Sequence, residues 1–354
     1  MNAPPALRGA LEAFFARIWW TPRPGWQATL LRPLAAMYGA AWRRRQARSV
    51  PATRLPVPVL VVGNLIVGGA GKTPTVIAVV QALQARGHRP GIVSRGHGRR
   101  GSEPRSVSAR HGFADAGELG DEPLLLARRT QVPVFVGRDR RATALALLRS
   151  HPAVDVIVAD DGLQHLALHR DAEIVVFDER GVGNGLLLPA GPLREPLPMR
   201  GVPMRHILYT GGVASTPLPG ALAQRALSLA WPLAAWHAGD SHAAQALATL
   251  RGQPLLAAAG LAAPEKFFGM LRQAGLQIEA LPLPDHFDFA TLPWPAQGPD
   301  VLVTEKDAVK LDPSRTAARR VWVLPLDLVL PEGLLDPLHQ QLFGAAPNPT
   351  PRTP

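Results

Sequence analysis

The sequence predicts an α/β protein with a doubly wound, mostly parallel sheet, a second, smaller α/β domain and an N-terminal amphipathic helical segment. Strand-like apolar runs alternate with helix-like runs between residues 57 and 178, as expected for βαβ units. A glycine-rich turn joins the first apolar run to a helix, and further apolar runs follow from residue 206. We expect an N-terminal segment, a sheet domain, a smaller domain and a C-terminal helix with a disordered tail, at residues 1–54, 55–205, 206–330 and 331–354.

The composition excludes several classes of protein. Hydrophobic residues make up 47% and charged residues 18% of the 354 positions, which excludes a wholly disordered chain and leaves enough length for two domains. The chain has no cysteine, so disulfides and thiolate metal sites are excluded, and a reducing cytosol suits it.

Residues 1–54 hold nine arginines and one acid, Glu12, so most of the net charge of +11 lies in this segment. The apolar side chains of its first helical run gather near one face: Leu7, Leu11, Phe14, Phe15, Ile18 and Trp19. Arginine and tryptophan on such a helix suit a membrane surface, and neither apolar run of the segment is long enough to span a bilayer. We predict that residues 1–50 lie on a membrane; a helix packed on the protein's own core is the alternative. Nucleic acid binding is not expected, because the basic residues lie beside large apolar ones.

Residues 57–73 predict a strand, a phosphate loop (P-loop) and the start of a helix. The usual pattern would have glycine at position 66, where this chain has Ile66. The chain has only four lysines, and the one within the first 265 residues lies in this loop. We predict that the loop binds nucleotide phosphates and that Thr73 also binds Mg²⁺. The phosphate-binding residues are Gly68, Gly69, Ala70, Gly71, Lys72 and Thr73. A turn that merely starts a helix is the alternative.

Strands and helices continue in alternation after the loop. We expect a helix over 73–87, strands over 90–94 and 132–137, and a helix over 138–150. The arginines and glycines of 95–100 follow a strand end, where open α/β sheets bind ligands, although a solvated loop explains them equally well. Asp121 and Glu122 open another helix, so helix capping alone accounts for them.

The run 154–165 begins as an apolar strand, and that strand ends in two acids, Asp160 and Asp161. An acid at this point is typical of a Walker B element, which contacts the Mg²⁺ of a bound nucleotide. A strand over 173–178 follows. Residues 304–307 do not have the spacing of a guanine-specific motif, so we expect ATP rather than GTP.

The second half predicts a smaller α/β domain, with strands beginning near residues 206, 253, 276, 299 and 320 and a helix over 264–275. The glycine at 260 belongs to no G-x-G-x-x-G pattern, so we expect an ordinary turn there.

The motifs together resemble one family. They are GNLIVGGAGKTP (63–74), the residues at 94–96, 120–123, 160–165 and 183–185, LLPAGPLRE (187–195), AAGLAAPEKFF (258–268), and the residues at 284–286 and 304–310. In this order they resemble the tetraacyldisaccharide 4′-kinases, the lipid A 4′-kinases. The family has a variant P-loop, which accounts for Ile66. His97 and Leu163 stand where tyrosine and phenylalanine are common.

The resemblance implies an ATP- and Mg²⁺-dependent lipid kinase. It would transfer the γ-phosphate to the 4′-hydroxyl of a tetraacylated glucosamine disaccharide 1-phosphate at the cytoplasmic face of the bacterial inner membrane, as a peripheral monomer. A P-loop ATPase for metal insertion or partition, and a non-catalytic membrane-bound nucleotide sensor, are the alternatives.

The resemblance also implies roles for single residues. Asp121 is the catalytic base with His286 as its partner, and Lys72 holds the phosphates of ATP. Since we place Asp121 and His286 in different domains, we expect the domains to close before they meet. The implied Mg²⁺ ligands are Thr73, Asp160, Asp161 and Glu195.

Overall fold

The computed structural model describes residues 14–48, 52, 54–96, 99, 101, 103–108, 115–197, 205–316 and 318–344. Leu7 and Leu11 of the predicted amphipathic face, His97, and the predicted tail beyond residue 344 lie outside these residues. The chain forms two compact units. Unit 1 comprises Met1–Ala70, Asp155–Ala223 and Leu330–Pro354, and unit 2 comprises Gly71–Val154 and Gln224–Val329.

Unit 1 contains five parallel strands in the order β5, β1, β6, β7, β8. Their bounds are β1 (Val59–Gly63), β5 (Val156–Asp160), β6 (Ala172–Phe177), β7 (Arg205–Tyr209) and β8 (Ala221–Leu222). Every residue of β1, β5 and β6 is buried. Strands covered on both faces have continuous apolar sequences, which is why these three could be located from the sequence.

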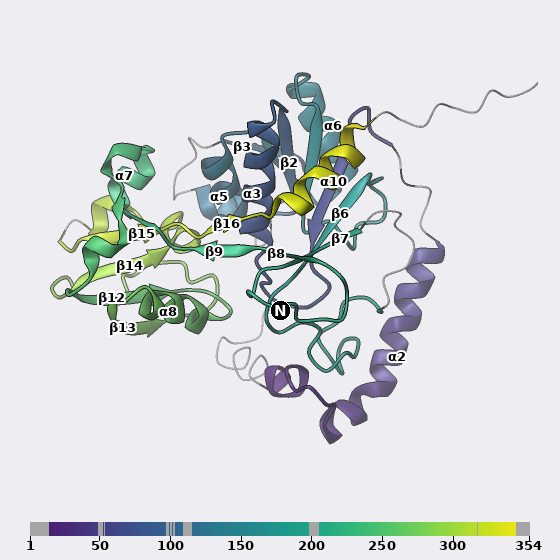
Figure 1. The fold of residues 1–354 in the computed structure, drawn as a ribbon, viewed down its shortest axis with the longest axis horizontal. Helices are drawn as coiled ribbons and strands as arrows, with labels where there is room; N and C mark the ends of the chain where they lie inside the picture. Colours follow the sequence, from purple (N-terminus) through teal and green to yellow (C-terminus); the bar gives the residue numbers. More distant parts are fainter. Residues whose placement is uncertain are drawn as a thin grey trace, which may run out of the picture. The chain divides into compact units, whose positions relative to one another are not determined.

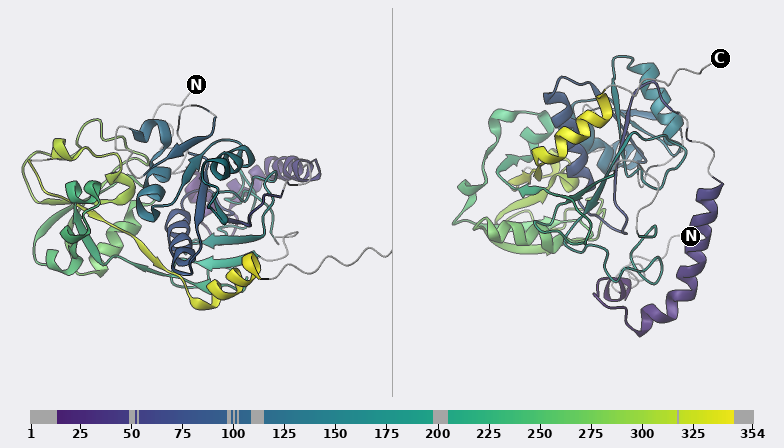
Figure 2. Two further views of the ribbon diagram at one scale, coloured as in Figure 1. Left: turned by 90° about the horizontal axis from the view of Figure 1, so that it is seen from above. Right: turned by 45° about the vertical axis from the view of Figure 1, so that its right-hand side comes forward.

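The described residues of unit 1 include three helical segments. Residues 14–19 are helical and end before Pro22, α2 (Trp26–Ala47) follows, and α10 (Glu332–Phe343) packs beside β6 (Figure 1). The right-hand view of Figure 2 shows α2 as one continuous helix. Among the described helices, none combines the length and the apolar character needed to cross a membrane.

The first part of unit 2 continues the alternation. Its elements are α3 (Lys72–Ala85), β2 (Pro90–Ser94), β3 (Arg105–Val107), α4 (Ala116–Leu119), α5 (Asp121–Thr130), β4 (Val134–Val136) and α6 (Arg140–Ser150). Strands β2 and β4 are parallel, and β3 is antiparallel to β4. Helix α6 begins after Asp139 because that carboxylate accepts hydrogen bonds from the amides of Arg141 and Ala142, at 2.9 and 3.1 Å.

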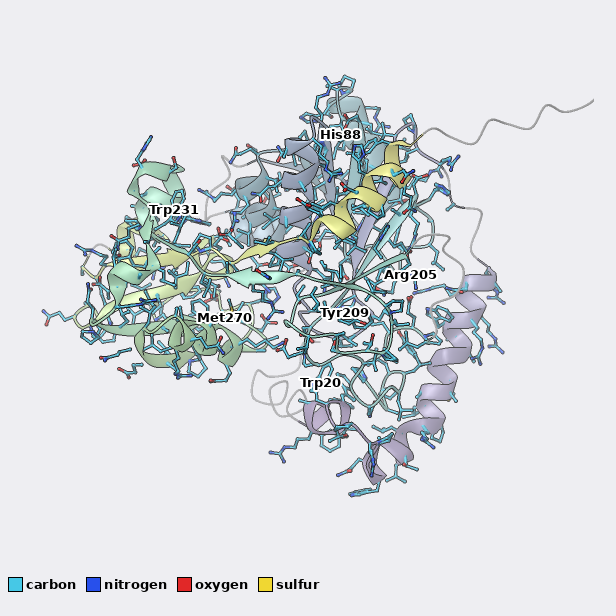
Figure 3. The ribbon with its side chains drawn as sticks, in the orientation of Figure 1. Trp20, His88, Arg205, Tyr209, Trp231 and Met270 are labelled. Atoms are coloured by element: carbon cyan, nitrogen blue, oxygen red, sulfur yellow. The ribbon has the colours of Figure 1, made fainter. Side chains whose placement is uncertain are left out.

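The second part of unit 2 is a six-stranded sheet in the order β11, β10, β15, β14, β12, β13, whose last four strands are parallel. The strands are β10 (Leu229–Pro232), β11 (Gln245–Ala246), β12 (Pro254–Ala259), β13 (Gln277–Pro282), β14 (Asp300–Thr304) and β15 (Val321–Leu324). The helices are α7 (Leu233–Ala238), η2 (Ser241–Ala243), η3 (Leu247–Leu250), α8 (Pro264–Gln273), α9 (Glu305–Ala308) and η4 (Pro313–Thr316). Helix α8, which carries Met270 (Figure 3), buries Phe267, Phe268 and Leu271 against this sheet.

The structure confirms the α/β class and the mostly parallel pairing, but it differs from the sequence analysis at one strand. We assigned the strand near residue 206 to the smaller domain, whereas β7, which carries Arg205 and Tyr209 (Figure 3), pairs with β6 in unit 1. An apolar run gives no information about which sheet it joins, which explains the error. A two-stranded ribbon, β9 (Gln224–Ala226) with β16 (Asp327–Val329), belongs to unit 2. The predicted domain boundaries stay predictions.

A buried ion-pair network joins four elements of unit 2. The two terminal nitrogens of Arg129, on α5, contact Glu305 of α9 and Asp327 of β16, each at 2.6 Å. The indole Nε1–H of Trp236, on α7, donates to Glu305 at 3.2 Å. Burial raises the pKa of the Glu305 carboxyl, and Arg129 opposes that rise. The carboxylate therefore depends on Arg129 for its charge.

Replacing Arg129 with methionine should leave Glu305 buried without its cation. We expect Arg129→Met to lower the free energy of unfolding by about 3–5 kcal/mol, measured by urea denaturation. Arg105→Met is the matched control, because the Arg105 and Glu118 side chains are 54% and 68% exposed; it should cost less than about 1 kcal/mol. Equal losses in the two variants would contradict a structural role for the buried network.

Candidate active site

Asp121 and His286 form a hydrogen-bonded pair within unit 2. The His286 Nδ1 lies 2.9 Å from the Asp121 Oδ2, and the Asp121 side chain is only 7% exposed. Asp121 is the first residue of α5, whose N-cap is Gly120, and its Oδ1 accepts the amide hydrogen of Glu122 at 3.0 Å. Helix capping alone therefore does not account for this carboxylate.

His286 lies in the turn that follows β13. Its φ of 59° is in the left-handed region, and its amide donates to the Gly260 carbonyl at 3.3 Å. We expected Asp121 and His286 on two domains that must close before the residues meet. That expectation was wrong, because both residues belong to unit 2 and are already in contact.

Five further charged side chains lie around the pair: Lys306, Lys310, Glu122, Asp285 and Asp307. The Lys306 Nζ lies 3.3 Å from the Glu122 Oε1 and 3.7 Å from the Asp285 Oδ1. The Lys310 Nζ lies 4.0 Å from the Asp121 Oδ2 and 3.4 Å from the Asp307 Oδ1. The sequence analysis assigned no role to Lys306 or Lys310. The available signal was that two of only four lysines in the chain lie four residues apart.

These neighbours determine the ionisation of the pair. Burial alone would raise the pKa of Asp121, but the hydrogen bond from His286 and the charges of Lys306, His286 and Lys310 lower it to about 2. The hydrogen bond to Asp121 raises the pKa of His286 against the effect of burial. Asp121 is thus an ionised carboxylate at neutral pH, held by a histidine with an increased affinity for protons.

The predicted metal-binding acids of unit 1 lie near the end of β5 and in the 187–195 segment. Asp160 is the buried last residue of β5, and Asp161 follows with a φ of 47°. The Arg194 guanidinium donates to the Asp161 Oδ1 at 3.1 Å and to the Gln164 Oε1 at 3.2 Å. Glu195 is buried 3.9 Å from Arg205, and burial raises the pKa of the Glu195 carboxyl. Within the described residues, no three His, Cys, Asp or Glu side chains already form a metal site.

The glycine-rich loop of unit 1 is fixed through its carbonyl groups. The Asn64 amide donates to the Gly68 carbonyl at 3.0 Å, Arg180 to the Gly69 carbonyl at 2.6 Å, and the Thr210 hydroxyl to the Ala70 carbonyl at 3.2 Å. Gly68 has a φ of 90°, which favours glycine. With these carbonyls engaged in hydrogen bonds, the loop is held in one conformation.

Ile66 has a packing role in this loop. It is fully buried and forms an isolated β-bridge with Leu193. A glycine at this position would leave that space unfilled, so the departure from the usual P-loop pattern has a structural cause.

In unit 2, Lys72 and Thr73 begin α3. Gly71, the N-cap, has a φ of 89°, again a conformation that favours glycine. The first turn of a helix presents backbone N–H groups and the positive end of the helix dipole, which together bind anions. The start of α3 can therefore bind phosphate.

The family model of tetraacyldisaccharide-1-P 4′-kinase, LpxK, matches residues 27–342 of the chain. The chain belongs to this family. The tetraacyldisaccharide-1-P 4′-kinase match includes the glycine-rich loop, the Asp121–His286 pair and the acids at the end of β5. It confirms the resemblance drawn from the sequence motifs.

Relatives within the tetraacyldisaccharide 4′-kinase family are similar over nearly their whole length. The protein of that name from Methylibium petroleiphilum is 54% identical over 339 residues, which cover 92% of this chain and 93% of the relative. The one from Leptothrix cholodnii is 54% identical over 326 residues, covering 90% and 93%. A crystal structure of LpxK from Aquifex aeolicus in complex with ATP is 27% identical, with a TM-score of 0.73, covering 90% of this chain and 100% of that one.

The ionisation of the pair gives the stability of the fold a specific pH dependence. The pKa of Asp121 is about 2 in the folded chain against its ordinary 3.8, so its contribution to stability is present above pH 3.8 and is lost as the pH falls toward 2. The raised pKa of His286 has the opposite effect on stability. The contribution of His286 to stability is complete below pH 6.5 and is lost as the pH rises through the pKa of His286 in the folded chain.

Of these two residues, therefore, only Asp121 changes its contribution between pH 5 and pH 3. We expect the difference in unfolding free energy between the native protein and Asp121→Asn to shrink by about 1 kcal/mol over this range. Urea denaturation at several pH values measures it. A difference that stays constant, or grows as the pH falls, would show that the carboxylate is not stabilised in its ionised form.

Proposed function

We propose that the protein transfers the γ-phosphate of ATP to the 4′-hydroxyl of a tetraacylated glucosamine disaccharide 1-phosphate, in lipid A biosynthesis. The family match over residues 27–342 carries this proposal, and the ATP complex of the Aquifex aeolicus LpxK supports ATP as the donor. The match favours the kinase over the ATPase and the nucleotide sensor that a phosphate loop alone allows.

The proposed reaction forms a bond between the 4′-oxygen and the γ-phosphorus and breaks the bond from that phosphorus to the β,γ-bridging oxygen. ADP leaves with the bridging oxygen, and the hydroxyl proton passes to the Asp121 carboxylate. The hydrogen bond from His286, at 2.9 Å, fixes the carboxylate in one orientation. Orientation matters because a phosphoryl transfer enzyme acts mainly by positioning its reactants and neutralising charge.

The proposed ATP site follows the sequence prediction. The residues from Gly68 to Thr73 would hold the phosphates, with the Lys72 ammonium on the β- and γ-phosphates. Thr73, Asp160, Asp161 and Glu195 would hold Mg²⁺, since hydroxyl and carboxylate oxygens are the ligands this ion prefers. When bound, Mg²⁺ neutralises the charge that develops on the phosphates. The Arg194 contact gives Asp161 a defined orientation, which supports a role at the metal site.

We also propose a peripheral position on the cytoplasmic side of the inner membrane. Four side chains of α2 repeat at helical spacing and are 70%, 69%, 51% and 69% exposed: Trp26, Leu30, Leu34 and Met37. We call this set the α2 apolar stripe. Arg43, Arg44 and Arg45 follow it near the end of the helix, where they can contact anionic headgroups. The lipid acceptor also resides in a membrane; the monomeric state remains a prediction.

Asp121→Ala should abolish phosphorylation of the lipid. With γ-labelled ATP, Mg²⁺ and the tetraacylated disaccharide 1-phosphate, we expect the native protein to label the lipid and the variant to be slower by about 100-fold or more, because the base is missing. Binding of a non-hydrolysable ATP analogue, measured by calorimetry, should be nearly unchanged.

Asp240→Ala is the control for removing an acid from unit 2, because Asp240 is exposed and far from the pair in sequence. It should retain activity. No labelling by the native protein would refute the kinase proposal, whereas near-native labelling by Asp121→Ala would refute only the assignment of the base.

Binding to vesicles should depend on the α2 apolar stripe. We expect Leu30→Ser/Met37→Ser to bind vesicles of anionic phospholipid about tenfold or more weakly in a sedimentation assay, since two apolar side chains are lost. Val213→Ser/Leu222→Ser is the matched control, because these apolar residues of unit 1 are also exposed. Equal binding by both double variants would contradict the proposal. Point changes are safer than deleting the segment, because the Trp19 indole N–H donates to the Pro189 carbonyl.

A further inference from the structure

Lys306 lies next to His286, and the proposed chemistry gives this lysine no role. It belongs to α9, a short helix that begins after Thr304, whose hydroxyl accepts the Asp307 amide hydrogen at 3.2 Å. The Lys306 Nζ lies 3.5 Å from the Nε2 of His286, the ring nitrogen that does not contact Asp121. The two nitrogens of the imidazole thus face a carboxylate and an ammonium.

The direction of hydrogen bonding follows from these partners. An ammonium group can only donate, so a hydrogen bond between Lys306 and Nε2 requires that Nε2 supply a lone pair. In a neutral imidazole the other nitrogen, Nδ1, then carries the hydrogen and donates it to the Asp121 carboxylate. A protonated imidazole would instead point an N–H at the ammonium.

The charges around His286 divide into two opposing groups. The Asp121 carboxylate on one side and the Asp285 Oδ2, 3.9 Å from Nε2, favour a protonated ring. Lys306 opposes them, and Lys310, 4.0 Å from the Asp121 Oδ2, acts in the same sense through that carboxylate. Glu122, at 3.3 Å, and Asp285, at 3.7 Å, hold the Lys306 ammonium in place.

We propose that Lys306 is a positioning residue that opposes protonation of His286 and favours the neutral tautomer with its hydrogen on Nδ1. This inference rests on the proposed function, since it concerns the partner of the proposed base. A neutral His286 orients the Asp121 carboxylate by a hydrogen bond. The pair can then still accept the proton of the 4′-hydroxyl group. A protonated His286 already holds one proton, so the pair is a weaker acceptor.

Removing the ammonium should make the pair bind a proton more readily. For Lys306→Met we expect the acid limb of the pH profile of kcat to move up by about half a pH unit or more, with a loss of about tenfold in kcat at neutral pH. The KM for ATP should change little. Lys306→Arg should restore the position of the acid limb, because it restores the cation.

A second measurement does not depend on turnover. In the ¹⁵N-labelled full chain, the two ring nitrogens of His286, identified by comparison with His286→Gln, report which of them carries hydrogen. We expect one protonated and one unprotonated nitrogen in the native protein once the pH exceeds the pKa of His286. In Lys306→Met we expect both to become protonated at a higher pH than in the native protein. Arg272→Met is the control, because Arg272 is an exposed cation on α8 of the same unit.

The outcomes separate the two proposals. A native protein that labels no lipid refutes the kinase proposal, while the ring-nitrogen measurement still tests the tautomer. An unchanged titration of His286 in folded Lys306→Met overturns the role of Lys306. An unchanged acid limb in Lys306→Met also overturns this role. A lysine that is merely structural would lower activity without moving the acid limb, and a lysine that binds ATP would raise the KM for ATP without moving it.

Discussion

The arrangement around the candidate active site depends on one constraint, the burial of the Asp121 carboxylate. A charged group that is 7% exposed is strongly destabilising unless other groups compensate it. Here the compensation comes from three separate segments: the helix amide of Glu122, the turn that carries His286, and the segment 305–310, which comprises α9 with Lys306 and the following Lys310. The need to stabilise one charge thus brings together residues 165 positions apart in the chain.

The fold could be predicted largely because its strands are buried. Continuous apolar runs located β1, β2, β4, β5 and β6, and the glycine-rich loop located the start of α3. The sheet to which β7 belongs could not be predicted, because its apolar sequence fits a parallel sheet in either unit. Hydrophobic periodicity identifies a strand but does not identify its neighbours.

Less of the candidate site than of the fold could be predicted from the sequence. Local spacing suggested only capping for Asp121, and its association with His286 came from the family resemblance. Lys306 and Lys310 received no role, because a short helix with mixed charges resembles an ordinary solvated turn. The structure shows that Lys310 is instead nearly buried between Asp121 and Asp307. The ligands of Mg²⁺ and the division of the chain into domains remain predictions.

Arg129 and Asp121 stand eight residues apart on the same helix, so they are separated by about 12 Å along its axis. Asp121 contacts His286 at the start of α5, and Arg129 contacts Glu305, the first residue of α9, toward its end. Helix α5 is therefore attached at two points to the segments that carry the histidine and the lysines. Any motion of α5 during a catalytic cycle would move Asp121, His286 and α9 together. The geometry of the Asp121–His286 pair would then be preserved during such a motion.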